Sequence, residues 1–540
     1  MRQTRLSFSA SALLSAVFLF SGCGSDAAKH TANSNSAPTE SKPNISANAA
    51  NAATNTVATN MPVASERGGD ERTNGERYAE IAENPFLETR RAPLSTFSID
   101  VDTAAYSNVR RFLNEGNLPP KDAVRIEELI NYFEYDYPQP VSNVPFSVTN
   151  EVAACPWNPK HKIVSIGLQG KKVALDNMPP SNLVFLLDVS GSMNSADKLP
   201  LLKEGLRVLV NQLKPQDRVA IVVYAGSSGL VLPSTNDKNR ILDALNNLEA
   251  GGSTNGGQGI QLAYKTAAEN FIADGNNRVI LATDGDFNVG LTSDDELVRL
   301  IEAKRQSNIY LSVLGFGSGN LNDSMMEKLA DKGNGNYAYI DSGAEARKAL
   351  GQQVAGTLLT IAKDVKIQVE FNPAKVAGYR LIGYENRLLA NHDFNDDRKD
   401  AGEIGAGHSV TALYEVVPAG QKIENDGIEL KYSEVRPAET KFDDELLTVK
   451  LRYKEPKDET SKLLTIGLLD NQNKIDQASN NLKFAAAVAQ FGLIMRDSRY
   501  KGAANFRSLT ELAGRALGSD LRGYRADFLK LVEKAERIKG

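Results

Sequence analysis

Two apolar runs that each end in an aspartate place the strongest constraint on how this chain can fold. Residues 182–187 (NLVFLL) are followed by Asp188, and residues 278–283 (RVILAT) are followed by Asp284. Continuous apolar runs of this length are typical of strands that are buried on both faces of a parallel sheet. Open α/β sheets bind their ligands at the carboxyl ends of such strands. We therefore expect both aspartates to lie at one ligand-binding edge.

Hydroxyl side chains accompany these aspartates. The run LLDVSGSM places Ser190 and Ser192 on alternate residues after Asp188, and Thr254 lies in the glycine-rich sequence GGSTNGG. Mg²⁺ binds oxygen ligands at about 2.0 to 2.1 Å and keeps several waters, so a site with few carboxylates suits it better than Ca²⁺. Mn²⁺ would also be accepted. The pattern predicts a divalent metal site; the alternative is that the aspartates only cap the following helices and the glycine-rich sequence is only a loop.

The order Asp-x-Ser-x-Ser, then Thr, then Asp resembles the metal-ion-dependent adhesion site of the von Willebrand factor type A family. All five positions match. The resemblance implies that Ser190, Ser192 and Thr254 contact the metal. It implies that Asp188 and Asp284 bind it directly or through water. It also implies an open metal position that takes an acidic side chain from a partner protein.

Strand-like apolar runs alternate with amphipathic stretches over residues 181–361. This alternation predicts an α/β domain with a doubly wound, mostly parallel sheet of the type A or Rossmann-like kind. We expect an α+β accessory region over residues 79–180 and a small β-rich domain over residues 362–479. Residues 480–540 are expected to form a helical region. Both flanks resemble the regions that surround the type A domain in a group of bacterial lipoproteins.

The amino terminus predicts export. Residues 1–22 have a basic start and an apolar stretch that is shorter than the roughly 20 residues of a membrane-spanning helix, as in a secretory signal peptide. The ending at Cys23 resembles a bacterial lipobox, which implies a lipidated cysteine. Gly24 follows in place of the aspartate that marks inner-membrane retention in many Gram-negative lipoproteins, so the outer membrane is favoured. Residues 23–78 predict a lipid anchor and a disordered tether, because they contain few large apolar residues.

Several function classes find little support. The net charge is −5 without a long basic run, which argues against nucleic acid binding. The sequence contains no G-x-S-x-G, P-loop or H-E-x-x-H motif, and its four histidines are dispersed. We therefore predict that the chain is not an enzyme. Cys155 is expected to be a small buried apolar residue.

Together these patterns predict an envelope-anchored lipoprotein that binds a protein partner through a Mg²⁺-dependent adhesion site. One alternative is an envelope scaffold or assembly factor in which the metal is purely structural. Another is a hydrolase that uses metal-bound water.

Overall fold

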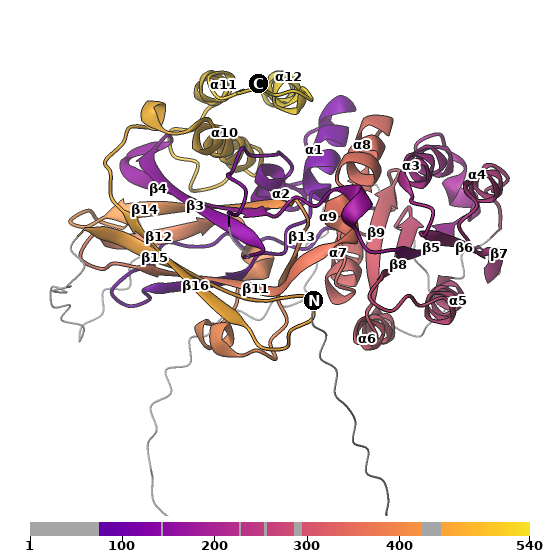
Figure 1. The fold of residues 1–540 in the computed structure, drawn as a ribbon. Coiled ribbons are helices and arrows are strands. Elements are labelled where there is room, and N and C mark those ends of the chain that lie inside the picture. The colour runs from indigo at the N-terminus through magenta and orange to yellow at the C-terminus, as the bar shows by residue number, and fades with distance from the viewer. Residues whose placement is uncertain (1–74, 142–143, 226–227, 253–255, 286–293, 424–443) are drawn as a thin grey trace, which may run out of the picture. The chain divides into compact units, whose positions relative to one another are not determined.

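A six-stranded sheet lies at the centre of the predicted type A region (Figure 1). Its strands are β5 (Ser181–Asp188), β6 (Arg218–Tyr224), β7 (Ser228–Thr235), β8 (Asn276–Thr283), β9 (Ile309–Phe316) and β10 (Tyr337–Ile340). They lie in the order β10-β9-β8-β5-β6-β7, and every neighbouring pair is parallel except β6 with β7. The predicted doubly wound, mostly parallel sheet is confirmed. The computed structural model describes residues 75–540 except 142–143, 226–227, 253–255, 286–293 and 424–443.

Helices cover both faces of this sheet because its central strand is apolar on both faces. All eight residues of β5 are buried. Leu183, Phe185 and Leu187 point into one core, while Val184 and Leu186 point into another. One face carries α3 (Leu199–Gln212), α4 (Lys238–Asn246), α8 (Gly343–Arg347) and α9 (Val354–Leu358), and the other carries α5 (Gly256–Glu269), α6 (Asp294–Arg305) and α7 (Asp323–Lys332). Figure 1 shows α3 and α4 above the sheet and α5 and α6 below it.

The flanking regions form two further sheets that share one apolar core. The first has the order β1-β12-β14-β4-β3; in the second, of order β13-β11-β15-β16, β2 also pairs with β11. Their strands are β1 (Leu87–Glu88), β2 (Leu94–Ser98), β3 (Phe146–Cys155), β4 (Asn158–Gly170), β11 (Thr360–Phe371), β12 (Val376–Ile382), β13 (Gly402–Gly405), β14 (Ser409–Pro418), β15 (Glu445–Lys454) and β16 (Lys462–Leu469). Strands from before and after the central sheet therefore pair directly, as β4 does with β14.

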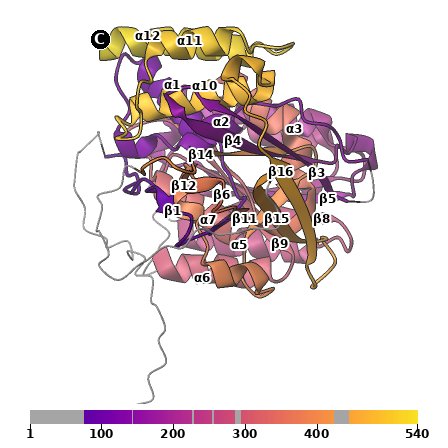
Figure 2. The same cartoon turned by 90° about the vertical axis from the view of Figure 1, so that its left-hand side faces the viewer.

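Five helices pack on the outer side of the first of these sheets. They are α1 (Ala104–Asn114), α2 (Ile126–Asn131), α10 (Asn480–Met495), α11 (Phe506–Gly514) and α12 (Tyr524–Lys539). Figure 2 shows α10 between the sheet and the outer pair α11 and α12. Every residue of α10 from Phe484 onward is buried, and none of the described helices is long and apolar enough to cross a bilayer. Cys155 is buried and unpaired, as predicted.

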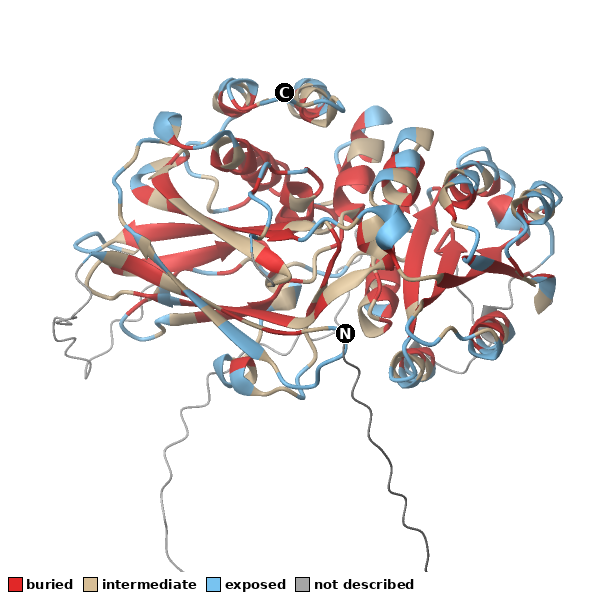
Figure 3. Ribbon diagram, in the orientation of Figure 1, coloured by how far each residue is buried: buried red, intermediate tan, exposed pale blue. Residues whose placement is uncertain are grey.

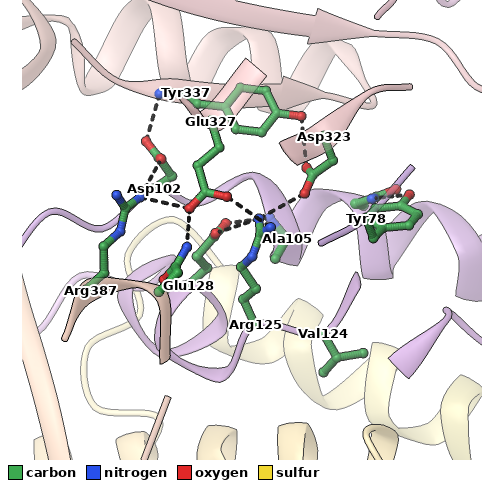
Figure 4. A network of polar contacts seen from close by, with 12 residues as sticks. Tyr78, Asp102, Ala105, Val124, Arg125, Glu128, Asp323, Glu327, Tyr337 and Arg387 are labelled. Atoms are coloured by element: carbon green, nitrogen blue, oxygen red, sulfur yellow. Dashed lines mark hydrogen bonds and ion pairs between the residues drawn. The ribbon is translucent and has the colours of Figure 1, made fainter. Parts of the chain in front are cut away.

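A buried network of charged side chains joins α7 to the flanking regions (Figure 4). Arg125 donates to Asp323 at 2.8 Å and lies 2.9 Å from Glu327. Arg387 lies 2.9 Å from Glu327 and 3.4 Å from Asp102, whose pKa is raised mainly by burial. Two guanidinium groups therefore hold the carboxylates of α7 against the flanking elements. Removing either cation would leave buried negative charge without its partner.

Candidate metal centre at the carboxyl edge of the sheet

The two predicted aspartates lie at adjacent strand ends. β5 has β6 on one side and β8 on the other, so the direction of winding changes at β5. Asp188 is the last residue of β5, and Asp284 follows the last residue of β8. Both side chains are fully buried. The sheet therefore brings together residues that are 96 positions apart, at the edge where open α/β sheets bind ligands.

The turn after β5 presents its oxygen atoms close together. The backbone N–H of Ser190 donates to Asp188 Oδ1 at 2.8 Å, and Thr283 Oγ1 donates to Asp188 Oδ2 at 3.4 Å. The hydroxyl oxygens of Ser190 and Ser192 are 2.9 Å apart. Ser190 is buried, whereas Ser192 is exposed, so the cluster meets solvent on the Ser192 side. Burial and the neighbouring charge of Asp284 raise the pKa of Asp188 to about 6, against the opposing hydrogen bonds from Ser190.

A lysine neutralises the second carboxylate. Lys198 Nζ donates to Asp284 Oδ2 at 2.8 Å, and the lysine is 10% exposed. Burial alone would raise the pKa of Asp284, but the hydrogen bond and charge of Lys198 dominate and lower it. The stem of Lys198 packs against Gly317, where a Cβ atom would come within 2.2 Å of the lysine side chain. The ammonium group is thus held over the carboxylate by close packing.

The loop of residues 317–322 supports the Asp284 side of the site. Gly285 has φ +103°, and a Cβ atom there would lie 2.7 Å from the backbone of Asn320, Leu321 and Asn322. Asn320 also hydrogen-bonds Asp284 and helps to lower its pKa. Only glycine allows this close approach without a clash.

The first described residues of the chain contact the same loop. The backbone N–H of Arg77 donates to the carbonyl of Leu321 at 2.8 Å. The backbone carbonyl of Arg77 accepts the N–H of Asp323 at 3.2 Å. Glu76 Oε1 accepts the backbone N–H of Gly319 at 2.9 Å. Glu76 and Arg77 fall at the carboxyl end of residues 23–78, which were predicted as anchor and tether, yet both are hydrogen-bonded to the loop that contacts Asp284.

Two predicted residues lie outside the described part of the chain, Thr254 and Cys23. The residues just before Thr254 are described. Gly251 N–H donates to the carbonyl of Val189 at 2.7 Å, and Gly191 N–H donates to the carbonyl of Gly252 at 3.1 Å. The glycine-rich stretch is thus attached to the Asp-x-Ser-x-Ser turn up to the residue before the gap.

The described donors fit a small divalent ion. Bonds of about 2.0 to 2.1 Å in an octahedral complex put neighbouring ligand oxygens about 2.9 Å apart. The hydroxyl oxygens of Ser190 and Ser192 have this separation and hydrogen-bond each other. Asp188 and Asp284 supply carboxylates beside them. These residues would hold Mg²⁺ or Mn²⁺, which would supply an electrophilic centre to an outside ligand.

The sequence indicated the motif residues but not Lys198 and Asn320, which contact Asp284. Lys198 follows Asp188 by ten positions, and Asn320 lies beyond another strand and helix. No spacing rule connects either residue with the motif, because both reach the site through tertiary packing. The glycine after Asp284 was the one visible signal of a close approach at this edge.

The fold and the motif define a von Willebrand factor type A domain. The family model described as "von Willebrand factor type A domain" matches residues 183–286, "von Willebrand factor" matches residues 72–165, and "Uncharacterized protein YfbK, C-terminal" matches residues 356–538. The chain is 43% identical over 472 residues to "Uncharacterized protein YfbK" of Escherichia coli (strain K12), covering 86% of this chain and 81% of that protein. The chain belongs to the family of this E. coli protein.

More distant similarities are confined to parts of other proteins or are weak. The chain is 28% identical over 260 residues to the human inter-alpha-trypsin inhibitor heavy chain H3, covering 44% of this chain and 28% of that protein. A solved von Willebrand factor type A structure from Catenulispora acidiphila matches at 17% identity and a TM-score of 0.40, covering 74% of this chain and 91% of that one. Proteins with type A domains are typically non-enzymatic, and the domain family suggests a role in protein interaction.

Proposed function

We propose that this chain binds a protein partner through a divalent cation held at the carboxyl edge of the type A sheet. Mg²⁺ is the expected ion, and Mn²⁺ can replace it. The proposed ligands are Asp188, Ser190, Ser192, Thr254 and Asp284. The observation that carries the proposal is the cluster of two buried carboxylates and two hydroxyls at the switch point of the sheet, which is exposed at Ser192.

The charge balance favours an acidic partner. Asp188 and Asp284 contribute two negative charges, and the ammonium of Lys198 contributes one positive charge, which leaves one negative charge. Adding a divalent cation gives one net positive charge in a partly buried site. Serine hydroxyls do not neutralise that charge, and a bound ion is the largest local charge in such a site. A carboxylate from another protein would complete both the charge and the coordination.

Calorimetric titration of Mg²⁺ into the chelator-treated chain tests the metal site. We expect one binding site in the unmodified chain and none in Asp188→Asn. Asp176→Asn is the matched control, because Asp176 is exposed and precedes the opposite end of β5. Equal Mg²⁺ binding by Asp188→Asn would contradict the site.

Capture from a cell-envelope extract tests the adhesion role. We expect the immobilised chain to retain a partner in Mg²⁺ that chelator releases, and Asp188→Asn to retain none. Mg²⁺ binding that raises the melting temperature without any Mg²⁺-dependent capture would favour the structural alternative. Metal-dependent turnover of an ester or peptide substrate would favour a hydrolase.

We also propose that the chain is exported and anchored by lipid on Cys23, with residues 23–78 as anchor and tether. The outer membrane is favoured in a Gram-negative cell because Gly24 is not the retention aspartate. Mass spectrometry of the amino-terminal peptide should find a lipidated cysteine, and Cys23→Ser should release the chain from the membrane fraction. An unmodified Cys23 in the membrane fraction would contradict the anchor.

A further inference from the structure

The strand β16 lies at the edge of its sheet with unusually apolar, exposed side chains. It pairs with β15, and no other described strand pairs with it. None of its eight residues is fully buried, and Figure 3 shows the strand in tan and pale blue. Leu463 and Leu469 are 58% and 59% exposed. Leucines this exposed on a strand with a free backbone edge indicate an unfilled pairing site.

The composition of β16 does not protect this edge. Proteins commonly block an exposed edge with proline, with charged side chains along the strand or with a bulge. Residues 463–469 (LLTIGLL) contain no proline and no charge. Leu464 and Leu468 point inward and are partly buried against the core shared by the two flanking sheets. Another strand beside β16 would complete the burial of Leu464 and Leu468. It would also cover Leu463 and Leu469 on the outer side.

The sequence of β16 and the next residue is nearly symmetric about Ile466. Residues 462–470 are Lys-Leu-Leu-Thr-Ile-Gly-Leu-Leu-Asp. In an antiparallel pair centred on Ile466, Leu463 of one copy faces Leu469 of the other on the outer side. Leu464 faces Leu468 on the inner side. Residues directly opposite in an antiparallel pair share a face, so this register puts outer leucines against outer leucines and inner against inner.

The charges at the two ends agree with the same register. Residue 462 is a lysine and residue 470 an aspartate, so each end of the pair would bring opposite charges together. Within one chain Lys462 pairs with Glu455, and Asp470 pairs with Lys162 at 2.5 Å. The lysine is still 49% exposed. A parallel arrangement would instead put lysine beside lysine at one end and aspartate beside aspartate at the other.

We propose that two copies of this chain associate through β16, pairing antiparallel about a twofold axis at Ile466 to form one continuous sheet. A twofold interface requires a self-complementary surface, which the near-symmetric sequence supplies. Backbone hydrogen bonds provide the affinity, and the facing leucines fix the register. This interface lies on the flanking sandwich and is independent of the proposed metal centre.

Sedimentation equilibrium tests the proposal on the unmodified chain, two double variants and one single variant. Leu463→Lys with Leu469→Lys puts like charges opposite each other twice and should weaken the dimer at least about tenfold. Leu463→Lys with Leu469→Glu carries the same number of changes but puts opposite charges together, and should dimerise at least ten times more strongly than the double lysine variant. Leu521→Lys is the control, because Leu521 is 94% exposed away from β16.

Circular dichroism and thermal unfolding should establish that all variants fold, so that a change in mass reports on association. A monomer at all concentrations of the unmodified chain would overturn the proposal and leave a strand from another protein as the occupant. A dimer that survives the double lysine change would also overturn it. Equal weakening of the lysine–lysine and lysine–glutamate variants would overturn the antiparallel register.

Discussion

Replacing Asp188 by asparagine should stabilise the metal-free chain at neutral pH while it removes metal binding. Burial raises the pKa of Asp188 to about 6, from an ordinary value of 3.8. At about 1.4 kcal/mol per pKa unit, keeping this carboxylate ionised well above pH 6 costs about 3 kcal/mol of folding free energy. Asparagine has nearly the same shape and can still accept the backbone N–H of Ser190, but it carries no charge.

The sign of the pH dependence follows from the raised pKa. Stability linked to Asp188 is fully present below pH 3.8 and is lost as the pH rises through about 6. The advantage of Asp188→Asn should therefore be about 3 kcal/mol at pH 7.5 and about 0.5 kcal/mol at pH 4. For a unit of about 470 residues that unfolds cooperatively, 3 kcal/mol corresponds to roughly 3 °C in melting temperature.

Scanning calorimetry in chelator at both pH values measures this difference, with Asp176→Asn as the exposed control. Adding Mg²⁺ at pH 7.5 should raise the melting temperature of the unmodified chain and leave Asp188→Asn unchanged. A lower melting temperature for Asp188→Asn in chelator at pH 7.5 would refute the reasoning. So would a gain of the same size at pH 4, because the carboxylate in the folded chain is then almost fully protonated and carries little buried charge.

Three further predictions concern the surroundings of the site. Lys198→Met should tighten Mg²⁺ binding about tenfold or more in a calorimetric titration, because it removes a positive charge beside a proposed ligand; unchanged or weaker binding would contradict the charge balance. Arg387→Met should lower the free energy of unfolding by about 3 to 5 kcal/mol, since it leaves several buried carboxylates without their cation, whereas the exposed Arg398→Met should leave thermal unfolding unchanged. Glu76→Ala should speed hydrogen exchange at the Gly319 amide, which loses its acceptor, and equal exchange rates would show that this hydrogen bond is absent in solution.

Local patterns predicted the elements whose sequence carries a strong period or a long apolar run. The periodicity of residues 104–114 predicts a helix, and α1 has these bounds. The pattern also predicts helices over residues 480–496, 505–516 and 520–539, and α10, α11 and α12 agree with them to within a few residues. Alternation predicts a strand over residues 97–101, but β2 lies at Leu94–Ser98 and shares only two residues with it. Strands β12 and β13 were not predicted, because β12 contains few apolar residues in alternation and β13 is short and glycine-rich.

The relation between the flanking regions could not be predicted from sequence. Residues 79–180 and 362–479 were expected as two separate regions, and this division remains a prediction. In the structure β4 pairs with β14 over eight residue pairs, and β2 pairs with β11, so the two regions contribute strands to the same sheets. A strand does not encode which distant strand it will pair with, because alternation specifies a face and not a neighbour.

The sequence alone determined the chemistry of the candidate site. Asp188 and Asp284 follow apolar runs that are typical of buried strands, and the serines come at fixed spacing after the first of them. Tertiary structure decided the electrostatics, because Lys198 precedes α3 and reaches Asp284, 86 positions later, only in the folded chain. Short-range spacing fixes which donors share a turn, whereas the charge that those donors carry depends on burial and on partners from distant segments.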